Sequence, residues 1–329
     1  MKSICRTQVL IGSILMAGLV TQHAYSQPIS YYPQTNTPSA NPTVIYVNPV
    51  SGIDAPEAGR NTIAPLRTIT YALKQALPGT IVQLAPGNYS SRNGEIFPLV
   101  LRQGVTLQGD QFTKGQTVAI NGGGKYISPT FARQNVTLLT EQDSTIIGIS
   151  ISNPNKRGTG VWIESSNPTI KNSTFTQSHR EGIFVTGKAA PKIEANVFTK
   201  NGGNGISIAD SAAGEIRRNL FQDTGFGLAI GGTSEPTVVG NIIVQNRDGM
   251  FISEEARPVL RNNVIESNKR DGVVIAACSE AQPDLSGGNI FNNNGQYDIH
   301  NSGVNSVMAS SNLLEHSRVK EQHQYHCGT

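Results

Sequence analysis

A short pattern recurs at a nearly constant interval through the second half of the chain: a glycine, an apolar residue, any residue and a second apolar residue. The first copy is Gly160-Val161-Trp162-Ile163, and each later copy follows the previous one by 22 or 23 residues. Apolar residues that alternate in this way predict a short strand with one face turned inward. A period of this length is typical of a solenoid, in which successive copies stack. The glycines that begin the copies are Gly160, Gly182, Gly205, Gly227, Gly249 and Gly272.

Two more signals occur in each copy. A Pro or Gly turn leads from the glycine strand to a second apolar position, and an asparagine then precedes a large apolar residue by two positions, except that the first copy has Ser173 there. Because the amide of asparagine both donates and accepts hydrogen bonds, stacked asparagines can bond to those above and below. The second apolar positions are Ile170, Ile193, Ile216, Val238, Leu260 and Leu285, and the asparagines are Asn196, Asn219, Asn241, Asn263, Asn289 and Asn312.

The strands of one copy cannot bury their inner faces alone, but copies stacked in register bury them together. The sequence therefore predicts an all-β fold, a single-stranded right-handed parallel β-helix over residues 44–315, with regular coils over residues 158–315. The main alternative is a leucine-rich horseshoe, but its Leu-rich signature is missing. A propeller blade would need about 40 residues per repeat.

Residues 65–77 are predicted to form a helix that caps the N-terminal end of this solenoid. Apolar residues from Leu66 to Leu77 fall at helical spacing, Pro65 suits the first turn, and Pro78-Gly79 ends the helix. A cap is expected there because a β-helix otherwise ends in an apolar core with unpaired strand edges.

The first 26 residues have the features of a signal peptide. Lys2 and Arg6 precede an apolar stretch, and Ala24-Tyr25-Ser26 supplies small residues for cleavage near Ser26. We therefore expect a secreted or periplasmic protein without a membrane span, because an apolar helix needs about 20 residues to cross a bilayer. Residues 27–43 are expected to form a flexible leader and residues 316–329 a C-terminal tail.

The mature chain is expected to carry almost no net charge. Loss of the two leading cations leaves 24 basic and 23 acidic residues without a basic stripe, which argues against a nucleic-acid partner. Cys278 and Cys327 are expected to form one disulfide in an oxidising compartment, with two unrelated thiols as the alternative. His316, His323, His326 and Cys327 of the tail could bind a metal, since His323 and His326 have a possible ligand spacing, but Cys327 is expected in the disulfide. No metal site and no cofactor are therefore predicted, and calcium is left open without a motif to support it.

A set of motifs near the start of the predicted solenoid is similar to those of an extracytoplasmic bacterial family. The motifs are Pro65-Leu66-Arg67-Thr68-Ile69, Pro78-Gly79-Thr80-Ile81, Ala85-Pro86-Gly87-Asn88-Tyr89 and Gly104-Val105-Thr106-Leu107-Gln108-Gly109-Asp110. They closely resemble the domain of unknown function 1565, within the pectate-lyase-like β-helix superfamily, and the resemblance covers residues 45–315. It implies the fold and a link to carbohydrate-binding and sugar-hydrolysing β-helices, but it supplies no catalytic residues.

Three of the repeat glycines are directly preceded by an arginine and an acidic residue. In two of these turns the acidic residue is an aspartate, Asp248 or Asp271. These two aspartates occupy equivalent places in adjacent coils, so their backbones should lie about 5 Å apart. Two carboxylates this close repel, which raises the pKa of one and can place an acid beside a base, as glycosidases require. The alternative interpretation is ordinary turn chemistry, with the neighbouring arginines neutralising the acids.

The middle residue of each glycine strand points outward, and three of these residues are aromatic: Trp162, Phe184 and Phe251. Exposed aromatic side chains on a flat parallel sheet could stack on sugar rings, whose repeat of about 5 Å resembles the spacing of the coils. The smaller Ser207 and Ala229 lie between the second and third aromatic residues. Alternatively, another segment of the chain covers this stripe, because contiguous exposed apolar surface usually has a partner.

Three functions fit this sequence. The favoured one is a monomer that binds extracellular or envelope polysaccharide through Trp162, Phe184 and Phe251. The second is a polysaccharide hydrolase or lyase with Asp248 and Asp271 as catalytic residues, and whether the protein is an enzyme is left open. The third is a purely structural or adhesive surface protein, which burial of the aromatic stripe would favour.

Overall fold

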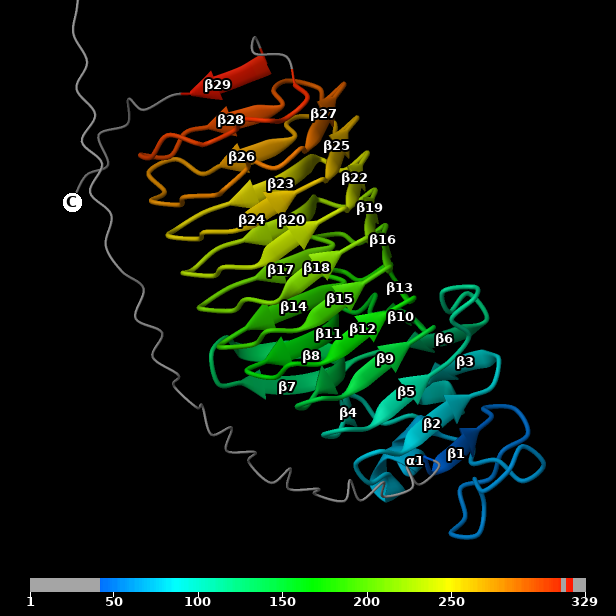
Figure 1. Cartoon of the computed structure of the whole chain (residues 1–329). Coiled ribbons are helices and arrows are strands. Elements are labelled where there is room, and N and C mark those ends of the chain that lie inside the picture. The colour runs from blue at the N-terminus through cyan, green and yellow to red at the C-terminus, as the bar shows by residue number, and fades with distance from the viewer. Residues whose placement is uncertain (1–41, 315–317, 322–329) are drawn as a thin grey trace, which may run out of the picture. The chain divides into compact units, whose positions relative to one another are not determined.

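A computed structural model describes residues 42–314 and 318–321. In this part the chain winds into a right-handed parallel β-helix with three sheets, named A, B and C (Figure 1). Strands pair in parallel with their neighbours in the stack, except that β7 is antiparallel to β8. The predicted fold class is confirmed. The predicted signal peptide, residues 27–41 of the leader and most of the predicted tail lie outside the described residues.

Sheets A and B contain nine strands each, and sheet C contains eleven. Sheet A consists of β1 (Val44–Val47), β2 (Ile81–Leu84), β5 (Thr106–Gln108), β9 (Thr145–Ile147), β12 (Thr169–Lys171), β15 (Lys192–Glu194), β18 (Glu215–Arg217), β21 (Thr237–Val239) and β24 (Val259–Arg261). Sheet B consists of β3 (Gly87–Ser90), β6 (Val118–Asn121), β10 (Ser150–Ser152), β13 (Thr174–Thr176), β16 (Val197–Thr199), β19 (Leu220–Gln222), β22 (Ile242–Val244), β25 (Val264–Glu266) and β27 (Ile290–Asn292). Sheet C consists of β4 (Leu99–Leu101), β7 (Gly124–Ser128), β8 (Ala132–Thr140), β11 (Gly158–Glu164), β14 (Ile183–Thr186), β17 (Ile206–Ile208), β20 (Phe226–Ile230), β23 (Asp248–Ile252), β26 (Val273–Ile275), β28 (Ile299–Asn301) and β29 (Val319–Glu321).

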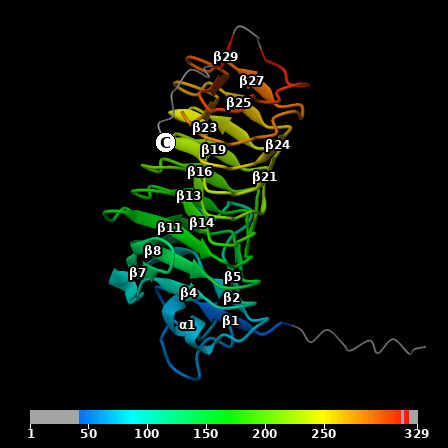
Figure 2. The ribbon, with the colours of Figure 1, turned by 90° about the vertical axis from the view of Figure 1, so that its left-hand side faces the viewer.

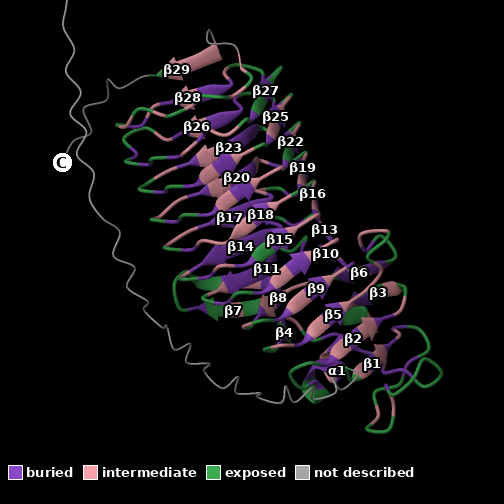
Figure 3. Cartoon of the chain, viewed as in Figure 1, coloured by how far each residue is buried: buried purple, intermediate pink, exposed green. Residues whose placement is uncertain are grey.

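The inner faces of the three sheets enclose one apolar core, in which equivalent residues of successive coils lie above one another (Figure 3). In sheet A, Ile170 pairs with Ile193, and Ile193 with Ile216, as the repeat predicted. In sheet B the rings of Phe175, Phe198 and Phe221 stack with centroid separations of 4.9 and 4.7 Å. Register and burial therefore follow directly from the repeat.

The predicted asparagines form a hydrogen-bonded ladder at one corner of the solenoid. Asn241 is typical: its Nδ2 donates to Ile216 O at 2.9 Å and to Asn263 Oδ1 at 3.0 Å. Its Oδ1 accepts from the backbone N–H and from Nδ2 of Asn219, both at 3.0 Å. Each side chain thus satisfies buried backbone groups in the corner and ties its coil to the next one.

A second ladder, which the sequence analysis missed, occupies another corner. Asn246 Nδ2 donates to Asn268 Oδ1 at 3.2 Å, and Asn268 Nδ2 donates to Asn294 Oδ1 at 2.9 Å. The sequence does contain a signal for this ladder, because an asparagine stands five residues after each of four members of the first ladder. At both corners the residue before the ladder position has a left-handed backbone, as Arg218 and Asp223 show, with φ of 53° each. That conformation turns the chain sharply within one residue.

The N-terminal helix is shorter than predicted. Helix α1 spans Ile69–Gln75 rather than residues 65–77, because the Oγ1 of Thr68 accepts from the N–H of Tyr71 and caps the first turn. Leu66 lies before the helix in extended backbone, bridged to Val47 of β1.

Helix α1 lies at the N-terminal end of the solenoid, where it packs against β1, β2 and β4 (Figures 1 and 2). Ile69, Ala72 and Leu73 are buried there, whereas Leu77, predicted on the same apolar face, is 70% exposed. No helix in residues 42–314 or 318–321 is long and apolar enough to cross a membrane.

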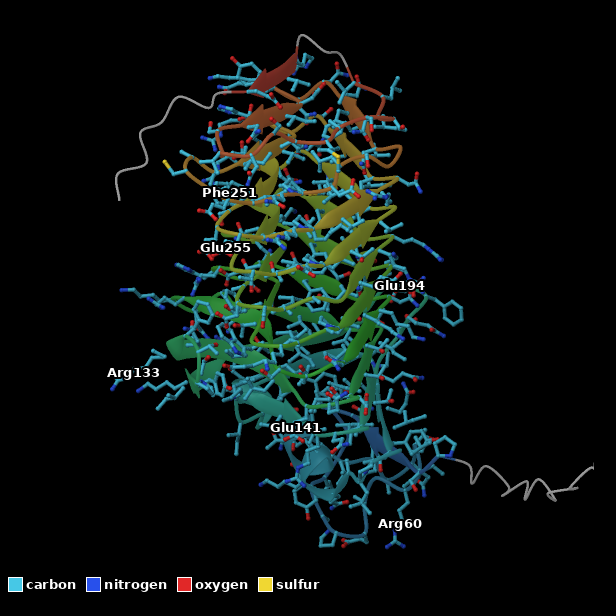
Figure 4. The ribbon with its side chains drawn as sticks, turned by 60° about the vertical axis from the view of Figure 1, so that its left-hand side comes forward. Arg60, Arg133, Glu141, Glu194, Phe251 and Glu255 are labelled. Atoms are coloured by element: carbon cyan, nitrogen blue, oxygen red, sulfur yellow. The ribbon has the colours of Figure 1, made fainter. Side chains whose placement is uncertain are left out.

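Removal of one ladder amide should destabilise the fold strongly. Asn241→Ala leaves the backbone N–H of Asn219 and the carbonyl of Ile216 without their buried partners, so we expect a loss of about 3 kcal/mol in the free energy of unfolding. Urea unfolding followed by circular dichroism measures it. The control Glu255→Ala removes an exposed side chain from the same region and should change stability by less than about 0.5 kcal/mol (Figure 4). Equal midpoints for the two variants would contradict a stabilising role of the ladder.

Candidate functional site

The outward face of sheet C carries the residues that the sequence singled out. One column of side chains runs along the stack, one residue from each strand, and from Trp162 to Val274 its order is the one that the repeat predicted. From β11 to β29 the column consists of Trp162, Phe184, Ser207, Ala229, Phe251, Val274, His300 and Lys320.

A β-hairpin covers the first part of this column. The chain turns back after β7 and continues as β8, whose first residues extend beyond the part that pairs with β11. The turn between β7 and β8 is the tip of this hairpin, and its residue Phe131 lies over β11 and β14. Trp162 and Phe184 stack with ring centroids 4.3 Å apart, and Phe131 of the hairpin packs edge-on against both rings. Trp162 is 1% exposed and Phe184 is 6% exposed. Of the two alternatives that the sequence left open for these rings, the structure shows the covered one, so Trp162 and Phe184 are not available as contacts for a ligand.

Glu164 fastens the hairpin to the sheet. Its Oε2 accepts from Trp162 Nε1 at 2.9 Å and from the hydroxyl of Tyr126 at 3.0 Å. Its Oε1 accepts from the hydroxyl of Ser128 at 3.0 Å, and from the N–H and hydroxyl of Thr130 at 3.1 and 2.8 Å. Burial raises the pKa of Glu164, but these hydrogen bonds outweigh it and hold the pKa below its ordinary value.

The hairpin also borders a hollow of about 860 Å³, lined by Tyr126, Phe131 and four cationic side chains among other residues. The cations are Lys125, Arg133, Lys156 and Arg157. All four are exposed, the lining contains no acid, and none of them forms an ion pair with another described residue. Figure 4 shows Arg133 projecting from the hairpin. The sequence does not reveal this cluster, because its members come from separate segments that only the hairpin brings together.

Beyond the hairpin the column is partly open. Phe251, labelled in Figure 4, is half-buried. Its ring stacks on that of Phe226, with ring centroids 5.0 Å apart. The guanidinium of Arg247 lies over the Phe226 ring, 4.5 Å from its centroid. Of the three predicted contact residues, Phe251 is therefore the one that a ligand on this face can reach.

Asp248 and Asp271 lie in adjacent coils, as expected, but their carboxylates have different partners. Asp248 is fully buried, and Arg270 binds it through two bonds, Nε to Oδ1 at 3.1 Å and Nη2 to Oδ2 at 2.5 Å. The Oδ1 of Asp271 accepts from the N–H of Tyr297 at 2.9 Å, and its Oδ2 lies 3.1 Å from His300 Nδ1. Asp248 thus forms a buried ion pair with Arg270, whereas Asp271 faces the imidazole ring of His300.

In the described part of the chain, no group of three or more His, Cys, Asp or Glu residues is arranged to hold a metal ion. The tail residues His316, His323 and His326 lie outside that part. Cys278 is disulfide-bonded, and its predicted partner Cys327 also lies outside the described residues.

Acid should loosen the hairpin. Because the pKa of Glu164 is lowered in the folded state, its contribution to stability is complete above the ordinary Glu pKa of about 4.3 and is lost as the pH falls through the lowered value. Trp162 is the only tryptophan of the chain, so acrylamide quenching of its fluorescence reports how well the hairpin covers it. We expect quenching to rise below about pH 4.

The variant Glu164→Gln should raise quenching at neutral pH and abolish its acid dependence, because an amide nitrogen cannot accept the hydrogen bonds that a carboxylate oxygen accepts. The control Glu141→Gln changes an exposed carboxylate outside the hairpin and should behave like the wild type (Figure 4). Quenching that stays constant from pH 7 to pH 3, about one unit below the ordinary Glu pKa, would show that Glu164 does not hold the hairpin.

Two family models match the chain. Residues 50–189 match "Protein of unknown function (DUF1565)", and residues 159–319 match "Right handed beta helix region". These matches confirm the resemblance that the opening motifs indicated. No curated protein matches the sequence.

Solved structures share the fold at low sequence identity. The pectate lyase Pel9A has a TM-score of 0.57 and 11% identity, over 82% of this chain and 79% of that one. A complex of XylC with xylose has a TM-score of 0.53 and 11% identity, over 79% of this chain and 67% of that one. At such identities the likeness shows the β-helix fold.

Proposed function

We propose that this β-helix, whose first half carries the DUF1565 match, binds an extracellular or envelope polysaccharide, with the hollow beside the hairpin as its main binding site. The hollow carries the proposal, because it combines two aromatic rings with four cations that no described acid neutralises. Aromatic and apolar surface with a few well-placed polar groups is typical of ligand sites. Guanidinium groups bind carboxylates and other oxyanions through paired hydrogen bonds.

The charge of the hollow favours an acidic polysaccharide over a neutral one. Cations held near one another without acids among them create a positive potential that attracts anions. A chain of linked acidic sugars can satisfy several of these cations at once, which a single small anion cannot do. The fold supports a carbohydrate ligand, since the similar solved structures include a pectate lyase and a protein in complex with xylose.

The binding face continues from the hollow along sheet C. Arg180 bonds through Nη1 to Oε1 of Gln134 in the hollow, at 3.4 Å, and pairs with Glu181. Arg247 and Arg270 stand in the equivalent turns further along, where both pair with Asp248 and Arg247 lies over Phe226, the ring on which Phe251 stacks. A polysaccharide that leaves the hollow would follow these turns, with Phe251 as its aromatic contact.

The proposed place of action is outside the cytoplasm, after removal of the predicted signal peptide, and the proposed form is a monomer. A structural or adhesive role is the second candidate, favoured by one observation: Trp162 and Phe184 pack against the chain's own hairpin. Polysaccharide cleavage by Asp248 and Asp271 stays a prediction, and the burial of Asp248 under two arginines makes a free acid–base pair the less favoured use of these residues.

Affinity electrophoresis in gels that contain polygalacturonate, with neutral xylan as the comparison, tests the proposal. The wild type should be retarded by polygalacturonate and less by xylan, and salt should weaken the retardation. Arg133→Ala with Arg157→Ala should weaken binding at least tenfold, because each lost charged hydrogen bond costs about 1 kcal/mol or more. Phe251→Ala should weaken it less.

The matched control is Arg60→Ala with Arg92→Ala, which removes the same charge from exposed positions outside the hollow. If both double variants lost binding equally, net charge rather than the hollow would explain it. If the wild type bound no polysaccharide on a broader glycan array, the structural or adhesive role would take the place of the proposed one.

A further inference from the structure

Three side chains near the C-terminal end of sheet C form a continuous hydrogen-bonded series. Oδ2 of Asp271 lies 3.1 Å from Nδ1 of His300, and Nε2 of His300 lies 3.3 Å from the hydroxyl oxygen of Ser302. Asp271 stands in the turn before β26, His300 in the middle of β28, and Ser302 directly after β28. The parallel register of neighbouring coils and the two-residue period of a strand bring them to the same outward face.

The acid determines which ring nitrogen carries the proton. An ionised carboxylate only accepts hydrogen bonds, so His300 must donate to Asp271 from Nδ1. In the neutral ring, Nε2 is then an acceptor, and the hydroxyl of Ser302 is the donor that faces it. This is the arrangement in which a histidine can take a proton from a serine.

The surroundings hold the acid and the ring in place. The second oxygen of Asp271 accepts from the N–H of Tyr297 at 2.9 Å, which prevents the carboxylate from turning away. The Tyr297 ring lies 5.2 Å from that of His300, tilted by 57°. The side chain of Asp271 is 6% exposed and that of His300 is 22% exposed, so a buried acid supports a ring that solvent and ligand can reach. Ser302 is half-buried.

We propose that Ser302, His300 and Asp271 form a serine-hydrolase site that removes acyl groups from ester-substituted sugars. Ser302 is the nucleophile and His300 the general base, both catalytic residues, and Asp271 is a positioning residue. The site lies on the face along which the proposed polysaccharide runs, so the choice of a sugar ester rests on the proposed function. The series of Ser302, His300 and Asp271, which we call the relay, rests only on the two hydrogen bonds that join them.

The chemistry balances with water as the second substrate. The oxygen of Ser302 bonds to the ester carbonyl carbon as its proton passes to Nε2 of His300. The bond from that carbon to the sugar oxygen then breaks, and His300 returns the proton to the sugar oxygen, which leaves as a hydroxyl. Water attacks the acyl-serine in the same way, which releases a carboxylic acid and restores Ser302.

A positive charge stands beside this relay. Lys320 of β29 is in register with His300 of β28, one step further along the column, and its ammonium nitrogen lies 5.3 Å from the centre of the Tyr297 ring. The N–H of Ser302 donates to Ile275 O at 3.2 Å. That amide is therefore not available to an oxyanion, and Lys320, the cation in register with His300, is the group that we propose to attract the developing negative charge.

Hydrolysis of p-nitrophenyl acetate by the full mature chain tests the relay without any polysaccharide. Ser302→Ala and His300→Gln should each lower kcat/KM at least 100-fold, about 2.7 kcal/mol. Ser253→Ala, the control, alters a half-buried serine two residues after Phe251, as Ser302 follows His300, and should leave the rate unchanged. A fluorophosphonate probe should label Ser302 in the wild type, identified by mass spectrometry, and not in the His300→Gln variant.

The split between kcat and KM separates positioning from mere structure. Asp271→Asn should lower kcat for p-nitrophenyl acetate and leave KM unchanged, because Asp271 orients the ring of His300 and does not touch the substrate. An unchanged kcat in this variant would show that Asp271 does not act on the ring.

The outcomes distinguish this proposal from polysaccharide binding. Wild-type hydrolysis and labelling of Ser302 support the relay even if no polysaccharide binds, in which case the sugar-ester assignment fails. Acetate release from acetylated polygalacturonate, lost in Ser302→Ala while that variant still binds the polymer, supports both. A wild-type rate equal to that of Ser302→Ala, together with no labelling of Ser302, overturns the relay and leaves the binding proposal unaffected.

Discussion

Stacking of each coil on its neighbours, in register and through hydrogen bonds along the axis, is the constraint on which every other feature depends. The backbone of a short strand here finds its partners only in the coils above and below. The two asparagine ladders extend the same rule to the corners, where Asn241 and Asn246 satisfy backbone groups that the sheets cannot reach. A shift of one residue between neighbouring coils would break the hydrogen bonds of both ladders. The register of the outer face is therefore as well defined as that of the core.

A defined register outside the core has a chemical consequence. Residues far apart in sequence come to lie in columns a few ångströms apart, with their directions set by the strands. Asp271, His300 and Ser302 meet for this reason, and so do Trp162 and Phe184. The same geometry that produces a row of apolar side chains can align an acid, an imidazole and a hydroxyl, because Asp271 and Ser302 lie next to the ends of strands whose register is fixed.

The carboxylate of Glu164 makes the two ends of the outward face of sheet C differ in their exposure to solvent. Glu164 holds the hairpin over Trp162, so the N-terminal part of the column is covered and a basic hollow forms at its border. Past the hairpin, Phe251 and His300 remain accessible. The hollow and the proposed hydrolytic relay therefore lie at opposite ends of one face, and a long polymer is the kind of ligand that can reach both.

The sequence by itself determined the repeat, the core positions, the first asparagine ladder and the order of the outward column, because these follow from local alternation and a fixed period. It did not determine what covers that column. Trp162 and Phe184 obey the outward rule of their strands and are nevertheless buried, since a hairpin outside the repeat folds over them. Likewise Leu66 matches a helical period, but its bridge to Val47 holds it in extended backbone. The partners of Asp248 and Asp271 were also decided in three dimensions, because the side chains that reach a carboxylate come from neighbouring coils and the period of a repeat says nothing about their direction.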